Sequence, residues 1–189
     1  MSRAWFLRCP AVLALCAALA GCGATHRASR TTASTAGAGT VNTLLKQGIA
    51  QAEANQLSQA TTTFEDILAV SPTNKYALYN LGVIAQEQHH LSGAVTRYDQ
   101  ALKADDTYTP AMYNKALILE TSNPDASLAL YHRIVKLNPK ASTAYLHMAI
   151  VYARRGELAQ AKQARAKAIA LDPALAGYRM PSPCTRATC

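Results

Sequence analysis

The chain has 189 residues, of which half are apolar but only 6% are aromatic, and it carries a formal net charge of +8. This length allows one domain with appendages, and its alanine-dominated apolar content suits close-packed helices better than a β-sheet core. No GxSxG, HExxH, P-loop or GxGxxG pattern occurs, which removes the usual motifs of hydrolases, zinc proteases and nucleotide-binding proteins. We therefore expect no enzymatic activity, no cofactor, no metal and no small-molecule substrate.

The N-terminal segment 1–21 has the features of a signal peptide. Arg3 and Arg8 precede an apolar run of about ten residues, which is too short to span a bilayer and has the length of a signal-peptide core. The run ends in Leu19-Ala20-Gly21-Cys22, which resembles the bacterial lipobox. This resemblance implies cleavage before Cys22 and lipidation of its thiol, which would tether an exported protein to a membrane. The alternative is an ordinary secretory signal followed by an unrelated cysteine.

Residues 22–40 come next, and after the cysteine they are mainly Ala, Thr, Ser and Gly. Such a segment cannot bury enough apolar area to offset the entropy lost on ordering. We therefore expect a lipidated flexible linker. Together with the lipobox, it predicts a membrane-anchored lipoprotein of the bacterial cell envelope that faces the periplasm or the extracytoplasmic space.

One spacing recurs through residues 41–175. Small residues return at intervals of 34, 34 and 33 at Gly48, Gly82, Ala116 and Ala149. Two further series also repeat every 34 residues with one interval of 33, a small one at Ala60, Ala94, Ser127 and Ala161 and an aromatic one at Phe64, Tyr98 and Tyr131. The pattern resembles the tetratricopeptide repeat, a helix–turn–helix unit of 34 residues. The resemblance implies an all-α fold, an α-α superhelix (solenoid) of about four repeats. Glycine inside a helix costs about 1 kcal/mol relative to alanine, so its recurrence indicates close packing.

The expected helices form four pairs, in which the aromatic series fills the space between one pair and the next. In the fourth copy Arg165 replaces the aromatic residue, as expected for a terminal repeat with a polar outer face. We expect residues 176–189 to form a disordered tail, and whether its Cys184 and Cys189 pair is left open. The predicted helices span 41–54, 58–70, 74–88, 92–103, 109–121, 124–137, 141–155 and 157–171.

The resemblance also implies a binding surface, because in this family the first helix of each pair lines a concave groove. Apolar and aromatic residues recur there at i, i+4 spacing and so share a helix face. A continuous apolar strip usually marks a partner site, and we expect a peptide or an amphipathic helix of a protein partner to bind in it. Neighbouring asparagines would hold the peptide backbone by donating and accepting together. The candidate groove residues are Leu45, Ile49, Tyr79, Asn80, Val83, Tyr113, Asn114, Leu117, Leu146 and Ile150.

Alternatives to this groove stay open. Tyr79-Asn80 before Leu-Gly is common in the family without any ligand, and the chain's own linker or tail could cover the strip. The first two copies are slightly acidic and the last two are basic, which would suit an anionic lipid or a cell-wall polymer, although a solvated face is the simpler interpretation. Nucleic acid is not expected, since aromatic and basic residues are not interleaved.

The sequence thus predicts a membrane-anchored scaffold that mediates protein–protein interactions in the bacterial envelope. It resembles the small repeat lipoproteins that assist the assembly of pili or secretion complexes. The alternative function is a cell-wall or anionic-surface module that binds polymer through its basic C-terminal half.

Overall fold

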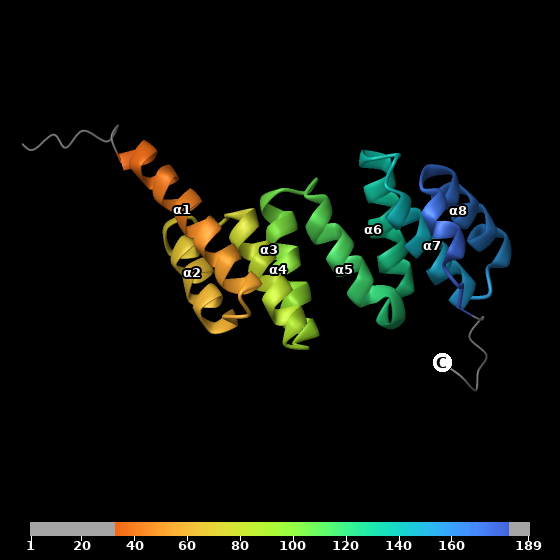
Figure 1. Ribbon diagram of the computed structural model, residues 1–189, viewed down its shortest axis with the longest axis horizontal. Coiled ribbons are helices and arrows are strands. Elements are labelled where there is room, and N and C mark those ends of the chain that lie inside the picture. The colour runs from red at the N-terminus through yellow and green to blue at the C-terminus, as the bar shows by residue number, and fades with distance from the viewer. Residues whose placement is uncertain (1–32, 182–189) are drawn as a thin grey trace, which may run out of the picture.

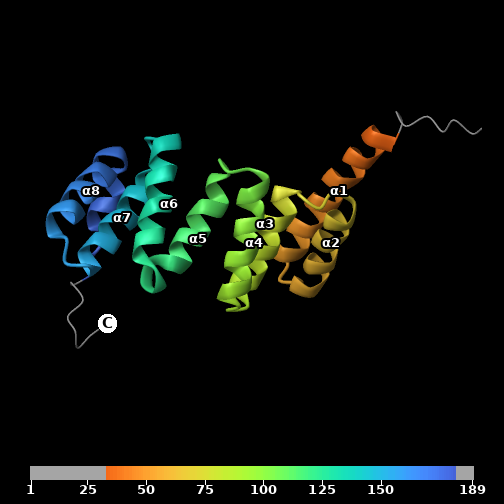
Figure 2. The ribbon, with the colours of Figure 1, turned by 180° about the vertical axis from the view of Figure 1, so that it is seen from behind.

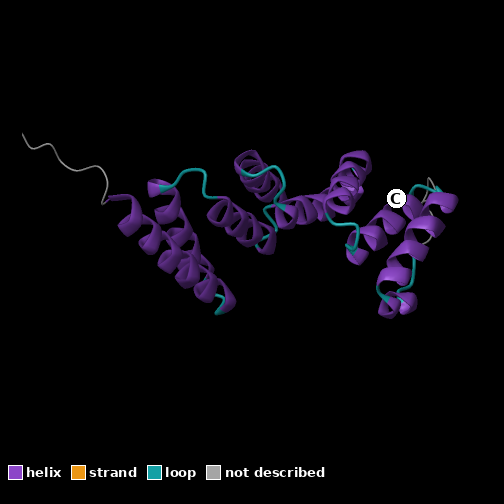
Figure 3. Ribbon diagram, turned by 90° about the horizontal axis from the view of Figure 1, so that it is seen from above, coloured by secondary structure: helices purple, strands orange, loops and turns teal. Residues whose placement is uncertain are grey.

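The computed structural model describes residues 33–181, and within this range it contains eight α-helices and one short 3-10 helix (Figure 1). The helices follow one another in antiparallel pairs along an elongated molecule, with α1 at one end and α8 at the other (Figure 2). Viewed from above, the described part consists only of helices and loops (Figure 3). This confirms the expected all-α superhelix of four repeats. The elements are α1 (Ala33–Glu53), α2 (Leu57–Val70), α3 (Lys75–Glu87), α4 (Leu91–Ala104), α5 (Thr109–Ser122), α6 (Pro124–Leu137), α7 (Ser142–Arg154), α8 (Leu158–Leu171) and η1 (Pro173–Gly177).

Local chemistry sets the helix ends. The side chain of Asn74 accepts hydrogen bonds from two backbone N–H groups of α3, and that of Asn123 accepts from one backbone N–H group of α6. Three of the four turns within a pair contain a residue in the left-handed region, namely Asn55 (φ 58°), His89 (φ 61°) and Gly156 (φ 77°). The turn between α5 and α6 is shorter and has no such residue, which accounts for the single 33-residue interval.

The first helix begins earlier than predicted. The linker was expected to extend to residue 40, but α1 already starts at Ala33 and projects past α2 (Figure 1). Extending an existing helix costs far less than nucleating one, so the packed half of α1 can support the projecting half. A Cβ added at Gly39 would meet nothing within 4 Å, in keeping with this projection. Although α1 has 21 residues, no helix within residues 33–181 combines the length and apolarity needed to cross a bilayer.

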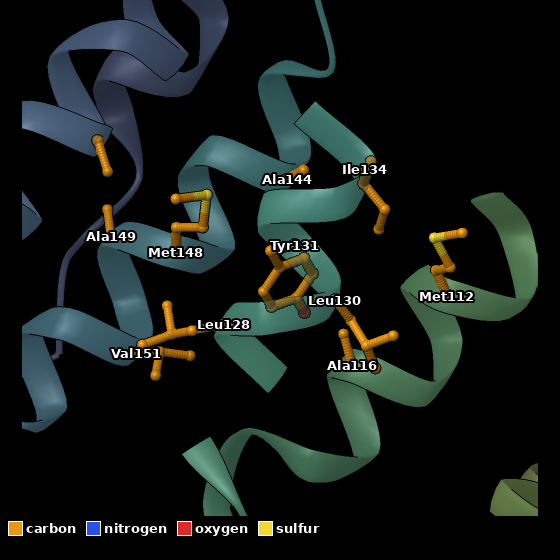
Figure 4. Close-up of a cluster of buried hydrophobic side chains, with 11 residues drawn as sticks. Met112, Ala116, Leu128, Leu130, Tyr131, Ile134, Ala144, Met148, Ala149 and Val151 are labelled. Carbon is orange, nitrogen blue, oxygen red and sulfur yellow. The ribbon is translucent and has the colours of Figure 1, made fainter. Parts of the chain in front are cut away.

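The aromatic series packs as predicted and also explains the glycines. Phe64, Tyr98 and Tyr131 are fully buried, and Phe64 clusters with residues of α3 in the next pair. Each of the first two rings also presses on its own first helix, because a Cβ at Gly48 would lie 2.7 Å from Phe64 Cε1 and one at Gly82 2.5 Å from Tyr98 Cε1. Figure 4 shows Tyr131 in the space between α5 and α7. The missing Cβ at Gly48 and Gly82 therefore lets these two rings lie directly against the backbone of the first helix.

The first helices lie on the inner side of the curved stack. Helix α1 contacts α3, α3 contacts α5 and α5 contacts α7, whereas the second helices of the described pairs make no comparable contacts with one another. Closer spacing of the first helices places them at the smaller radius of the solenoid. We call the surface formed by α1, α3, α5 and α7 the inner face, and the surface formed by α2, α4, α6 and α8 the outer face.

The chain beyond α8 packs back onto the last repeat. Arg165 Nη2 donates to the carbonyl oxygens of Ala176 (2.8 Å) and Tyr178 (3.4 Å), and Leu175 and Met180 pack against the last helix pair. The expectation of a disordered tail is therefore wrong for residues 176–181, while residues 182–189, including both tail cysteines, lie outside the described part. Arg165 is not only a polar surface residue, because it also holds this C-terminal segment in place.

Candidate functional site

The predicted strip on the inner face is open at its N-terminal end and closed at its C-terminal end. Ile49 is 41% exposed, whereas Leu146 and Ile150 are only 5% and 3% exposed because Leu175 and Met180 cover them. The other apolar and aromatic members of the strip are half-buried, and all belong to the first helices, as predicted: Leu45, Tyr79, Val83, Tyr113 and Leu117. The expected accessibility of the strip is thus corrected at its last two positions, and the chain's own C-terminal segment is what covers them.

The middle of the inner face contains a pocket of about 300 Å³. Residues from α3 and α5 form one side, and the end of α6 with the turn before α7 forms the other. Three of the predicted site residues line it, and the complete lining is Tyr79, Thr109, Pro110, Tyr113, Asn114, Ile134, Asn138 and Ala141. The structure therefore brings Tyr79, Tyr113 and Asn114 together, although they come from two different repeats.

The asparagines beside the strip already donate hydrogen bonds within the protein, Asn114 with both of its N–H groups and Asn80 with one. Asn114 Nδ2 donates to the hydroxyls of Tyr79 (3.2 Å) and Tyr98 (3.3 Å), and Asn80 Nδ2 donates to the carbonyl oxygen of Tyr76 at 2.7 Å. Burial raises the pKa of Tyr98 to about 12, so its hydroxyl stays protonated and donates to Gln86 Oε1 at 2.9 Å. Asn114 can therefore offer a bound peptide its amide oxygen only, which corrects the expectation that it both donates and accepts, whereas Asn80 keeps one N–H group as well as its amide oxygen.

Tyr113 belongs to an aromatic cluster that supports the wall of the pocket. Its ring lies edge-on to Tyr131 (centroids 6.0 Å apart) and to His147 (5.5 Å), and Tyr131 stacks on His147 at 5.7 Å. Burial raises the pKa of Tyr113, and a hydrogen bond with Thr143 partly offsets this effect. Tyr113 is thus a structural residue as well as a lining residue, and this limits its use as a site for mutation.

Glu120 lies under this cluster and joins three helices. Its Oε1 accepts from the Tyr131 hydroxyl at 2.9 Å and from His147 Nδ1 at 2.6 Å, and its Oε2 accepts from Arg154 at 3.1 Å. Burial alone would raise the pKa of Glu120, but the hydrogen bonds from His147 and Tyr131 and the charge of Arg154 hold it below its usual value. The sequence interpretation missed this group.

The repeat spacing contained a signal for Glu120. Gln86 and Glu120 stand 34 residues apart, and each accepts a hydrogen bond from the tyrosine hydroxyl of its own repeat. Comparing the repeats position by position would have predicted a polar partner for both rings. The substitution of an amide by a carboxylate in the third repeat then recruits His147 and Arg154 from the fourth.

No group of three or more His, Cys, Asp or Glu side chains that could hold a metal occurs among residues 33–181. His89 and His90 are exposed in the turn between α3 and α4. The predicted lipidation site, Cys22, lies outside the described residues.

The sequence profile of the tetratricopeptide repeat matches residues 45–108 and 119–176. The chain belongs to the tetratricopeptide repeat family. Proteins of this family are scaffolds for protein–protein interaction and are typically not enzymes, and the curved stack of repeats provides the extended surface on which a partner binds. The two matched stretches contain the end of α1 with α2 to α4, and α6 to α8, while most of α5 lies between them.

Several solved structures are similar in fold to this chain. A crystal structure of MamA superposes with a TM-score of 0.66 at 22% identity over 73% of this chain and 81% of that one. A tetratricopeptide repeat protein from Parabacteroides merdae gives 0.63 at 21% identity, covering 70% and 52% of the two chains. MamA from Desulfovibrio magneticus gives 0.62 at 19% identity, covering 71% and 76%. Identities this low show a shared fold alone. No curated protein matches the chain in sequence.

Proposed function

We propose that this tetratricopeptide repeat protein is a lipid-anchored scaffold of the bacterial cell envelope, where it holds a protein partner during assembly of a pilus or a secretion complex. The observation that carries the binding part is the inner-face pocket between Tyr79 and Tyr113, and Ile49 on α1 adds an exposed apolar side chain to the same face. The lipobox-like sequence ending in Cys22 supports the anchored location.

The pocket favours an extended peptide segment with an apolar side chain. Two tyrosine rings and Ile134 provide apolar contact, and the amide oxygen of Asn114 is left to accept from a peptide N–H group. A volume of about 300 Å³ is at the lower end of the range for ligand sites, so it accommodates one or two side chains of the partner and no more. The rest of the affinity would come from contacts along the inner face.

Site-specific photo-crosslinking in the native host tests the inner-face site. A photoreactive amino acid at Pro110, which is exposed at the pocket rim, should capture a small set of envelope proteins. The same amino acid at Ser92, which is exposed on the outer helix α4, provides the control. Equal capture from both positions would contradict a partner site on the inner face.

A matched pair of substitutions distinguishes the two faces energetically. Ile49→Glu places a charge on the open end of the strip and should reduce partner capture, because a buried unpaired charge is costly at an interface. Val70→Glu makes the same kind of change on the outer helix of the same pair, where the side chain is 71% exposed, and should leave capture unchanged. Both variants should keep the circular dichroism spectrum of the native chain.

A separate substitution tests the proposed lipid anchor at Cys22. Cys22→Ser removes the thiol that would receive the lipid and should release the protein from the membrane fraction into the soluble envelope fraction. Membrane retention equal to that of the native chain would rule out Cys22 as the anchor. This result would leave the inner-face site untouched, because the two parts of the proposal rest on different residues.

Unpaired lysines on the last repeats favour a second candidate, binding of an anionic cell-wall polymer. Lys136, Lys162 and Lys167 are exposed and form no ion pair with any carboxylate of the described part. Such binding should decline steeply with added salt, since exposed charges are screened within about 8–10 Å at physiological ionic strength. Binding at the inner face depends on apolar contact and should persist in the same salt.

A further inference from the structure

The outer face contains a groove larger than the inner-face pocket. It runs between α6 and α8, has a volume of about 690 Å³ and is floored by α7. Three residues of α7, Tyr145, Met148 and Tyr152, form the floor at i, i+3 and i+7 spacing, so they present one apolar stripe along the groove. The walls are formed by His132, Val135, Gln160, Gln163, Ala164, Ala166, Lys167 and Ala170.

The small side chains of α8 create this groove. The corresponding space between α2 and α4 has only about 370 Å³ and is lined on α4 by Arg97, Gln100 and Lys103. In the fourth repeat the positions of Arg97 and Lys103 are taken by Ala164 and Ala170. Two long side chains are thereby replaced by methyl groups, which opens the space between the outer helices. The repeat framework is unchanged, so the groove results from side-chain size and not from a different fold.

Charge around the groove is of one sign. All four carboxylates of residues 119–181 already have partners inside the protein: three pair with cations and one accepts from the backbone of η1 (Glu120, Asp125, Glu157 and Asp172). Lys167 in the groove wall is exposed, as is Lys136, which follows the lining residue Val135 on α6, and neither lysine pairs with a carboxylate of the described part. A ligand that carries carboxylates beside an apolar stripe would cover the apolar floor formed by α7 and pair with the two lysines at the rim of the groove.

The length of the groove indicates a helix. Its α8 wall runs from Gln160 to Ala170, and at 1.5 Å per residue this distance is about 15 Å, or roughly three helical turns. Polar groups from Gln160, Gln163 and His132 are distributed along both walls, unlike the dry lining that an acyl chain would need. Methionine and tyrosine on the floor supply adaptable apolar contact.

The undescribed ends of the exported chain are poor candidates for this occupant. Residues 23–32 and 182–189 contain arginine, no acidic residue and no large apolar side chain. A cationic polar segment would be repelled by the lysines of the rim and would leave the tyrosine floor uncovered.

We propose that the groove between α6 and α8 docks an amphipathic helix of a partner protein, with its apolar stripe on Tyr145, Met148 and Tyr152 and its acidic flanks against Lys136 and Lys167. This site is separate from the inner-face pocket. The chain would thus hold two partners at once, an extended segment on the inner face and an acidic helix on the outer face. A scaffold that brings two proteins together needs two such surfaces.

The probe is a fluorescein-labelled synthetic helix of about 18 residues, with leucines at i, i+3, i+4 and i+7 and glutamates on both flanks. Binding to the chain carrying Cys22→Ser is followed by fluorescence anisotropy. A second peptide with the same leucines and lysine flanks is the control, and its binding should be at least about tenfold weaker because of like-charge contact.

Three substitutions on α8 test where the peptide binds. Ala170→Trp fills the groove from an exposed position and should weaken binding at least about tenfold, as should Lys167→Glu in the wall. Lys162→Glu makes the same charge change on the same helix outside the groove lining, and should weaken binding at most about twofold. The melting temperature and helical content of each variant establish that the fold is kept.

Three results would overturn the proposal. Equal losses in Lys167→Glu and Lys162→Glu would mean a diffuse electrostatic attraction, and binding that survives Ala170→Trp would place the peptide elsewhere. Binding abolished by Ile49→Glu would assign the peptide to the inner face. Conversely, loss of inner-face partner capture in Ile49→Glu with unchanged peptide binding would support two independent sites.

Discussion

His147 Nδ1 donates to Glu120 Oε1 over 2.6 Å and so ties α7 to the end of α5. The Glu120 side chain is only 9% exposed, and it receives further hydrogen bonds from Tyr131 on α6 and Arg154 on α7. One carboxylate therefore fixes the relative positions of three helices next to the inner-face pocket. The geometry of that pocket depends on a residue that does not line it.

Glu120→Gln should destabilise the protein, because the amide cannot accept from three donors and carries no charge. The expected loss is about 1.5–3 kcal/mol, the range for hydrogen bonds to a charged group. The pKa of Glu120 is lowered in the folded state, so its contribution is complete above the unfolded value of about 4.3 and is lost as pH falls through the folded value. Urea unfolding at pH 5 and pH 3 measures this difference.

The difference between the native chain and Glu120→Gln should shrink from pH 5 to pH 3, because protonation of Glu120 progressively removes the charge that distinguishes it from the amide. Other carboxylates titrate equally in the two proteins and cancel. A difference that stays constant from pH 5 to pH 3 would show that the charge of Glu120 contributes nothing and that packing alone explains the loss.

Lys75 and Asp105 form a second link, between α3 and the turn after α4. Lys75 Nζ lies 2.5 Å from Asp105 Oδ2 and 5.1 Å from the ring centroids of both Tyr76 and Tyr108. Hydrogen bonds from Lys75 and then from Thr107 lower the pKa of Asp105 to about 2. Lys75→Gln should raise the pKa of Asp105 toward its ordinary value near 3.9, as measured by NMR titration of the carboxyl carbon.

The sign of the stability effect follows from the lowered pKa. The pairing stabilises the fold at and above pH 4 and is lost as pH falls toward 2. Native and Lys75→Gln proteins should therefore differ at pH 5 and converge near pH 2. An unchanged Asp105 titration in the variant would assign the shift to Thr107 and the turn backbone instead.

Gly82→Ala should destabilise the protein although alanine is the better helix former. The new methyl group would lie 2.5 Å from Cε1 of the fully buried Tyr98 ring, and such overpacking costs about 1–3 kcal/mol. Gly93→Ala is the control, since a Cβ there meets nothing within 4 Å, and it should stabilise by up to about 1 kcal/mol through helix propensity. Thermal unfolding of the two variants should shift in opposite directions, and equal upward shifts would refute the glycine–ring contact.

Much of this fold could be predicted from the sequence, because the repeat places its constraints at fixed intervals. Small residues such as Gly82 fit the close contact between paired helices, and aromatic residues such as Tyr98 fit the space between successive pairs. Their spacing therefore determines how the helices pair. The start of α1 could not be predicted in this way. Residues 33–40 carry no apolar period, and they are helical because the packed half of the same helix extends into them.

The solvent accessibility of the inner-face strip was harder to predict from the sequence than the fold. Leu146 and Ile150 have the same spacing as the exposed and half-buried members of the strip, and only the contacts of Leu175 and Met180 show that they are covered. Those two residues lie in a segment interrupted by proline and glycine, where no period can be detected. The outer groove was missed for another reason, because it arises from the absence of large side chains on α8.

The C-terminal cover leads to the last prediction. Met180 is half-buried on the cluster of Leu146, Ile150 and Ala168, so Met180→Ser should destabilise the last repeat by about 1 kcal/mol through lost apolar burial. It should also expose the covered end of the strip, increasing the fluorescence of the hydrophobic dye ANS. Arg179→Ser, at the exposed neighbouring position, should change neither property. If Met180→Ser leaves both dye binding and melting temperature unaltered, Leu175 alone covers Leu146 and Ile150, and the closed end of the inner face would then depend on η1 and the bonds it receives from Arg165.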